Sequence, residues 1–471
     1  MENPVPPARG AWAWRHSPRP ARHAPDFEVF ETLASPGCPI CALALRSVRR
    51  YLDALAYESV NDVELREHLR ASRGFCHHHA WQFLDLAADG LGTALIYGDV
   101  LGSVLAALRP EPAAVSPLRA LARLGRRQPR WRTMLRRLAP RGQCPACREL
   151  EGAATRYLEV LLPRLSEPDM RRRLAAAGGL CLPHLRQALG KSTTAQATLL
   201  AGATVAGLHR LGGGAPSPEA AASLLAGAAG AVASPPPHQP RSRGPAATVP
   251  TGQSECAVCH AALAAADACL LSLADGQANA DAVRLCNNHA WRLVALTPGA
   301  GGPWRRALGA AGDSLAQAIA AVSAGGDVAE WLASGLKLRP SELAQPTGSQ
   351  GFSRSQAQEE CPACRAEAAA ELAATERLLD DPSGPCLPHL QLALTLAGAD
   401  ERTRELLAAE REMLLALRAE LAEFVRKKDY RFAREPLGAE AGSPRRAVAL
   451  VAGARGLRGV GALPAGPRPG D

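Results

Sequence analysis

Aromatic residues are scarce in this sequence, because phenylalanine, tryptophan and tyrosine make up only 4% of its 471 residues. A hydrophobic core must therefore be built mainly from small and aliphatic side chains, and alanine is abundant throughout. That composition favours helices and argues against a β-sandwich or a β-barrel. A convincing alternating strand pattern is also missing. The sequence predicts an all-α protein.

Long apolar runs are missing as well. No stretch reaches the roughly 18 to 20 consecutive apolar residues of a membrane span, and the N-terminus has arginine and proline where a signal peptide needs an apolar run. We therefore expect a cytoplasmic protein without membrane contact, in a compartment that keeps thiols reduced. A carboxylate pair, a nucleophile triad and a phosphate-binding loop are also missing, so we expect no enzyme.

Lysine is nearly absent, with four residues against 50 arginines, which is typical of a GC-rich genome. The net charge of +9 is uneven: residues 1–250 carry 31 basic and 19 acidic residues, and residues 251–471 carry 23 and 26. The range 109–148 holds eleven arginines. It is the best candidate for nucleic-acid binding, through Arg126, Arg127, Arg130 and Arg132 with Trp131 for stacking. A solvated arginine face is the favoured alternative.

Cysteine is the exception among the scarce residues, and twelve of the 13 cysteines follow one pattern. A C-x-x-C pair is followed by a C-x-x-H pair, four times in the chain. The copies are Cys38, Cys41, Cys76 and His79; Cys144, Cys147, Cys181 and His184; Cys256, Cys259, Cys286 and His289; and Cys361, Cys364, Cys386 and His389. Only Cys269 lies outside the pattern, and we expect it to be a small buried residue.

Three thiolates and one imidazole form a closed tetrahedral zinc site. We predict up to four Zn²⁺ ions, each held within one copy and each clamping the open end of a helical hairpin. The segment between the pairs shortens to 26 residues in the third copy and 21 in the fourth. The fourth site is therefore the one we expect to be distorted or empty. An iron–sulfur cluster and a redox thiol pair are the alternative uses of these cysteines.

The copies alternate in type, which indicates a tandem duplication of a two-site unit. The first and third share His-Ala-Trp, and the second and fourth share C-P-A-C-R and C-L-P-H-L. The predicted divisions are a disordered N-terminus at 1–25, a first unit at 26–211, a linker at 212–255, a second unit at 256–453 and a disordered tail at 454–471. His77 and His78 are predicted to be surface residues, and Trp81 and Trp291 to pack over the metal sites.

A long amphipathic helix is predicted over 400–428, where it would close the bundle or form a homodimer seam. The charged segment 426–440 follows it, with sequence RKKDYRFAREPLGAE. Its basic residues would either meet the negative end of the helix dipole or grip an anionic partner.

Several of these motifs resemble a bacterial family of uncharacterised proteins, known as a domain of unknown function. The resemblance rests on CPIC, the R-Y-L-D-x-L-x-Y-E-x-V-N-D run at 50–62, FCHHHAW, GLCLPHL and the terminal RKKDYRFAREPLGAE. It covers most of 26–211 and again 256–453. Members look like one two-site unit with a similar ending. The resemblance implies metal binding and offers no reaction.

These observations predict a non-enzymatic, zinc-stabilised scaffold of two duplicated halves that binds a protein partner. A nucleic-acid-binding regulator and a thiol-based redox or metal sensor are the two alternatives.

Overall fold

The computed structural model describes residues 24–87, 89–109, 130–228, 256–275, 285–299, 301–323, 361–378, 384–397, 401–432 and 434–457. These residues form helices and connecting turns, with no strand among them. The predicted all-α class is therefore confirmed. In the first half the helices are α1 (Ala24–Thr32), α2 (Pro39–Tyr57), α3 (Val63–Ala71), α4 (His77–Leu86), α5 (Leu91–Ala107), α7 (Arg130–Leu138), α8 (Pro145–Arg164), α9 (Pro168–Ala177), α10 (Leu182–Leu189), α11 (Thr194–Gly212) and α12 (Pro218–Ala226).

The second half repeats this order with fewer described helices. They are α13 (Ala257–Ala274), α14 (Asn287–Leu296), α15 (Gly301–Ser323), α18 (Pro362–Leu378), α19 (Leu387–Ala397), α20 (Glu401–Lys428) and α21 (Ser443–Ala452), with short 3-10 turns η3 (Tyr430–Phe432) and η4 (Ala439–Gly442). By position after the cysteine motifs, α13 corresponds to α2, α18 to α8, α15 to α5 and α20 to α11.

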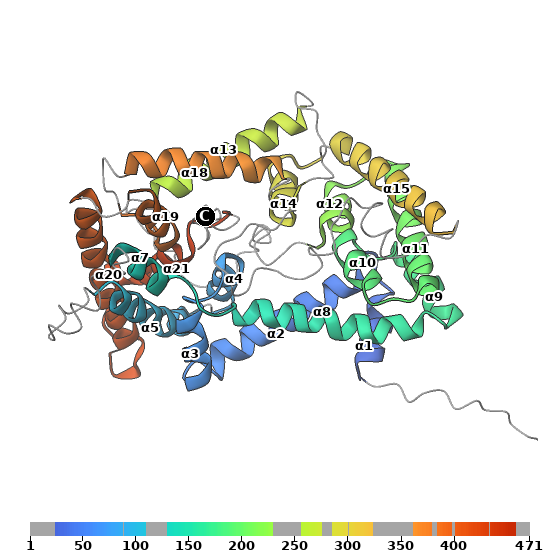
Figure 1. Ribbon diagram of the computed structural model, residues 1–471. Helices are drawn as coiled ribbons and strands as arrows, with labels where there is room; N and C mark the ends of the chain where they lie inside the picture. The colour runs from blue at the N-terminus through green and yellow to red at the C-terminus, as the bar shows by residue number, and fades with distance from the viewer. Residues whose placement is uncertain are drawn as a thin grey trace, which may run out of the picture.

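Each half is built around one pair of long helices that begin with C-x-x-C. In the first half α2 packs along α8, and in the second α13 packs along α18. The N-terminal part of each helix shares a core with the C-terminal part of its neighbour, so both pairs are antiparallel. Figure 1 shows the two pairs on opposite sides of the molecule, α13 and α18 at the top and α2 and α8 at the bottom.

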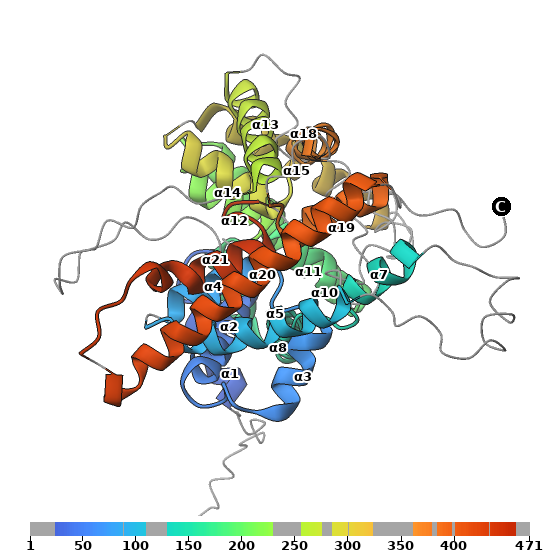
Figure 2. The ribbon, with the colours of Figure 1, turned by 90° about the vertical axis from the view of Figure 1, so that its left-hand side faces the viewer.

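The two hydrophobic cores lie at the two ends of these pairs, and each core takes residues from both halves of the chain. At one end α11 packs against α15, and at the other α5 packs against α20. Because α15 corresponds to α5 and α20 to α11, these two interfaces are equivalent. Figure 2 shows α20 crossing in front of α5 and α21 at the second of these ends. The halves are therefore joined as the subunits of a two-fold dimer would be.

Two of the predicted divisions are wrong in part. Residues 218–226, expected in a linker, form α12, which starts with a Ser217 cap and packs against α14 and α15. Residues 454–457, expected in a disordered tail, include the buried Ala454 and Leu457. Residues 1–23, 229–255 and 458–471 of the predicted disordered segments lie outside the described residues.

One helix among the described residues has the length and the mean hydropathy of a membrane span, although His260 and Asp267 interrupt its apolar residues. Residues Ala257–Ala274 of α13 are long and apolar enough to cross a membrane by those two measures alone. In this fold α13 instead packs along α18 and brings two cysteines to a cluster at its N-terminus.

Helix α11 crosses close to the end of α9, just before the second C-x-x-H motif. This close crossing depends on a glycine. A Cβ atom added to Gly207 of α11 would overlap the carbonyl oxygen of Gly178 at the end of α9. Gly207→Ala should therefore lower the free energy of unfolding by about 3 kcal/mol, because backbone must move. Gly202→Ala is the matched control, since nothing lies within 4 Å of its Cβ position on the same helix. Urea denaturation of both variants checks this; equal stability would contradict the crossing.

Glu410 of α20 is a buried carboxyl, 1% exposed, whose two oxygens have no hydrogen-bond partner among the described residues. Burial raises its pKa to about 8. The folded state then binds a proton more tightly than the unfolded state, so this group costs stability increasingly as pH rises from about 4.5 to 8.

Glu410→Gln should therefore stabilise the fold by an amount that grows over this pH range, to on the order of 4 kcal/mol at pH 8. Glu412→Gln, at an exposed position of the same helix, should show no such trend. Denaturation curves of both variants and the parent at pH 5 and pH 8 measure the difference. A constant difference across the range would show that Glu410 is ionised in the fold.

Candidate metal centres

The sixteen predicted ligands meet in four clusters, each of three cysteines and one histidine whose ligand atoms lie within 4.8 Å of one another. Centre I contains Cys38, Cys41, Cys181 and His184; centre II contains Cys76, His79, Cys144 and Cys147; centre III contains Cys256, Cys259, Cys386 and His389; and centre IV contains Cys286, His289, Cys361 and Cys364. Each is a Cys₃His set that can hold a metal ion.

The predicted pairing within each copy is wrong. Every C-x-x-C pair joins the C-x-x-H pair of the other copy in its half. Helix lengths explain this: α2, with 19 residues, rises about 28 Å from Cys38, while α3, with 9, returns only about 13 Å. Cys76 is therefore left at the far end of α2. There it meets the N-terminus of the antiparallel α8, which supplies Cys144 and Cys147.

The same exchange removes the expected strain in the fourth copy. Cys386 was predicted to return to Cys361 and Cys364 over 21 residues. Instead it joins Cys256 and Cys259 in centre III, so the short return does not have to close a site. The structure gives centre III a full ligand set in which all four residues are buried.

Each centre lies where two helices begin. The first cysteine of the motif is the N-cap of α2, α4, α8, α10, α13 and α14, and the last ligand is in the first turn. Helix N-termini carry partial positive charge and free N–H groups, which stabilise a nearby anion such as a metal-binding thiolate. The local fold thus prepares the sulfur atoms for metal binding.

The distances suit a tetrahedral ion. Sulfur–sulfur distances of 3.5 to 3.6 Å and distances of 3.0 to 3.7 Å from sulfur to the histidine Nδ1 recur in the four centres. Metal–sulfur bonds of about 2.3 Å and metal–nitrogen bonds of about 2.0 Å in a tetrahedron give edges of about 3.5 to 3.8 Å. The donors lie close to the positions that a zinc-sized ion requires.

Electrostatics at the centres also favour a cation. Burial lowers the pKa of His79, but the charge of Cys76 and a hydrogen bond with Cys144 outweigh burial and raise it to about 10. Burial likewise opposes the rise at His184, where hydrogen bonds with Cys38 and Cys41 bring the pKa to about 10. Each cluster therefore attracts positive charge, and a metal ion would compete with protons for it.

Two glutamates that sequence reasoning missed lie behind the histidines of the second half. Glu371 of α18 is 3.5 Å from Nε2 of His389, and Glu367 is 3.7 Å from Nε2 of His289. Both carboxyls are buried. A carboxylate close to the far nitrogen of a ligating histidine raises the basicity of that histidine. The first half has Leu150 and Ala154 at the corresponding positions, so this support belongs to centres III and IV.

One residue next to the ligands differs from the prediction. His77 is buried, not a surface residue, and its Nδ1 is 2.8 Å from the carbonyl oxygen of Ala452. Trp81 donates from its indole N–H to the carbonyl of Gly453, and Trp291 donates to Gly227. Cys269, the cysteine outside the pattern, is half-buried on α13 and packs against one core.

The predicted basic surface is described only in part. Arg126 and Arg127 lie outside the described residues, as does the side chain of Arg130, and Arg132 is exposed on α7. The charged segment 426–440 pairs with itself and its neighbours: Lys427 lies 2.7 Å from Glu440, and Arg426 lies 2.7 Å from Glu423. Its internal ion pairs favour the structural interpretation of that segment.

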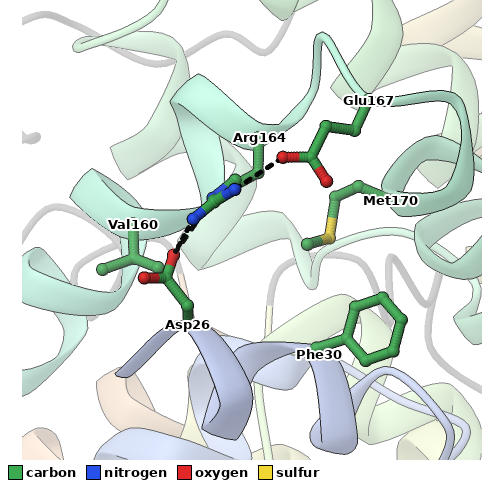
Figure 3. A pocket seen from close by; sticks show the side chains of 6 residues that line it. All are labelled: Asp26, Phe30, Val160, Arg164, Glu167 and Met170. Carbon is green, nitrogen blue, oxygen red and sulfur yellow. Dashed lines mark hydrogen bonds and ion pairs between the residues drawn. The ribbon is translucent and has the colours of Figure 1, made fainter. Parts of the chain in front are cut away.

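A pocket whose lining contains none of the metal ligands lies between α1 and the junction of α8 and α9 (Figure 3). Its polar wall is formed by Arg164, which lies 3.0 Å from Asp26 and 2.7 Å from Glu167. These ion pairs attach α1 to the helices beneath it. Phe30 and Met170 line the apolar side of the pocket.

The comparisons with known proteins support the predicted resemblance for the first half. Residues 26–200 match the model of a family of unknown function, DUF6062. The chain is also similar to an uncharacterized 23.9 kDa protein from Caldicellulosiruptor sp. (strain Rt8B.4), with 26% identity over 172 residues, which cover 36% of this chain and 73% of the relative. No solved structure matches. The DUF6062 match includes every ligand of centres I and II.

Proposed function

We propose that this protein is a zinc-binding helical scaffold whose four Cys₃His centres are structural. The observation that carries the proposal is the closed donor set: each cluster offers four protein ligands. Thiolate-rich tetrahedral sites of this kind suit Zn²⁺, and catalytic zinc sites instead leave one position open for water or substrate. The proposal therefore assigns the chain no reaction and gives it the role of binding a protein partner in the cytoplasm.

Metal analysis of the full chain tests this directly. Protein purified under reducing conditions without added metal should contain close to four zinc ions per chain. Replacement by Co²⁺ should give the absorption of tetrahedral thiolate coordination. Fewer than two zinc ions per chain, or the visible spectrum of an iron–sulfur cluster, would overturn the proposal.

The uneven exposure of the cysteines supports a second candidate, release of metal on oxidation. Two cysteines of centre II, Cys76 and Cys147, are only partly buried residues, and so is Cys286 of centre IV, while the cysteines of centres I and III are buried. Oxidation follows thiolate access. Under mild peroxide we expect centre II to oxidise first, as measured by mass spectrometry of each cysteine. Simultaneous oxidation of all four centres would exclude a sensor at centre II.

Nucleic-acid binding through the arginines of α7 and the preceding segment stays a prediction. Charge reversal at Arg126, Arg127, Arg130 and Arg132 should abolish retention on heparin if that surface binds polyanions. Unchanged retention would exclude it.

A further inference from the structure

A short sequence element occurs once in each half and contains the last helix described there, α12 in the first half and α21 in the second. Residues 217–228 and 443–454 share the pattern S-P-x-x-A-x-x-L-x-A-G-A. In each copy the helix, α12 or α21, ends at the first alanine of A-G-A, and the glycine follows with positive φ, 89° at Gly227 and 84° at Gly453. We call residues 226–228 and 452–454 the first and second AGA turns.

Each AGA turn donates a hydrogen bond to a ligand sulfur of its own half. The N–H of Ala228 lies 3.3 Å from Sγ of Cys41 in centre I, and the N–H of Ala454 lies 3.4 Å from Sγ of Cys259 in centre III. A backbone donor stabilises the charged thiolate. The turn is therefore a direct neighbour of the metal ligands.

The same turn accepts hydrogen bonds from the other half. At the first AGA turn the carbonyl of Gly227 receives the indole N–H of Trp291 at 3.0 Å, and that of Ala226 receives the amide of Asn287 at 2.8 Å. Trp291 and Asn287 flank His289, a ligand of centre IV. Gly227 therefore lies between the two centres: a Cβ atom added to it would be 3.6 Å from Nδ2 of Asn287 and 3.8 Å from Sγ of Cys41.

The second AGA turn repeats this arrangement with the halves exchanged. The carbonyl oxygen of Gly453 accepts from the indole N–H of Trp81 at 3.2 Å, and the carbonyl oxygen of Ala452 lies 2.8 Å from Nδ1 of His77. Both residues flank His79, a ligand of centre II. Centre I is thus bridged to centre IV, and centre III to centre II, always across the boundary between the halves.

We propose that the two AGA turns couple the metal centres in pairs across the two halves, so that centres I and IV open together and centres II and III open together. Each half is the binding partner that completes the other, as in a two-fold dimer. This inference rests on the proposed function, because it concerns the stability of the bound metal.

The test measures each centre separately in the full chain. The zinc-loaded protein is exposed to a chelator and N-ethylmaleimide, and alkylation of each cysteine is followed by mass spectrometry. Trp291→Phe removes one donor to the first AGA turn, and Trp81→Phe does so at the second. Trp304→Phe is the matched control, because Trp304 is 1% exposed and its indole N–H has no partner among the described residues.

Trp291→Phe should speed alkylation in both centre I and centre IV by about five- to tenfold, the value of one buried hydrogen bond, and leave centres II and III unchanged. Trp81→Phe should speed alkylation in centres II and III and leave centres I and IV unchanged. Trp304→Phe should not speed alkylation in one pair of centres more than in the other. If Trp291→Phe unfolds the chain, Asn287→Ala gives the same test.

Acceleration confined to centre IV, or equal in all four centres, would overturn the coupling while metal binding stands. Parent protein that alkylates equally fast with and without bound zinc would instead overturn the proposed structural role of the metal.

Discussion

Replacing Cys181 with serine should release one metal ion and expose Cys38 and Cys41 to alkylation, while Cys144 and Cys147 stay protected. Cys181 follows Cys144 and Cys147 in the sequence pattern, but its Sγ lies 3.5 Å from that of Cys41. Mutation of a residue that only hydrogen-bonds to a metal ligand lowers metal affinity about 10- to 100-fold. Loss of the ligand itself should therefore lower the affinity of centre I by more than about 100-fold. Metal analysis and mass spectrometry of each alkylated cysteine measure both effects.

Cys269→Ser is the matched control, because this cysteine lies outside the four centres. It should retain every metal ion. If Cys181→Ser loses its fold and all cysteines react, Cys181→His keeps a ligand at this position and should weaken protection in centre I alone. Alkylation of Cys144 and Cys147 in place of Cys38 and Cys41 would show that the ligands of each centre come from one copy of the motif.

Removing the metal should unfold the helices. Each structural zinc contributes on the order of 10 kcal/mol to folding, whereas a domain is stable by only about 5 to 15 kcal/mol in total. After chelation with reductant present, we expect most of the circular dichroism at 222 nm to be lost, and Zn²⁺ to restore it. Mg²⁺ is the control, because it prefers oxygen ligands and should restore nothing.

Acid, like the chelator, should release the metal ions and unfold the helices. The raised pKa of His79 and His184, about 10 in the metal-free clusters, means that protons compete with the ion for the ligands. Metal affinity should therefore fall as pH falls, and the helical signal with it. If the protein made metal-free by the chelator keeps its circular dichroism spectrum and its melting temperature, the hydrophobic cores fold without metal.

The ligands and the helical class could be predicted from the sequence, because both depend on local patterns. A C-x-x-C or C-x-x-H pair has the spacing that puts both ligands in the first turn of a helix, whatever the pair later meets. The pairing could not be predicted from the spacing alone. It depends on α2 being about twice as long as α3 and on the antiparallel contact between α2 and α8, which is a tertiary feature.

The AGA turns were missed for a different reason. Residues 217–228 are rich in alanine and glycine, a composition that predicts a linker. Only comparison with residues 443–454 reveals the shared pattern, and only the structure shows that its N–H and carbonyl groups contact cysteine and tryptophan side chains. The buried Glu367 and Glu371 gave no signal either, because an acidic residue in a helix is ordinarily solvated.

The second AGA turn has a consequence for synthesis on the ribosome, where a chain emerges from its N-terminus. The ligands of centres I and II are complete once His184 has been made, yet Trp81 finds its acceptor only when Gly453 follows. The hydrogen bond of Trp81 is thus completed by a residue made 372 positions later. A product that stops short of α21 would carry every ligand of centre II without its bridge to centre III, so a premature end of translation would weaken the region made first.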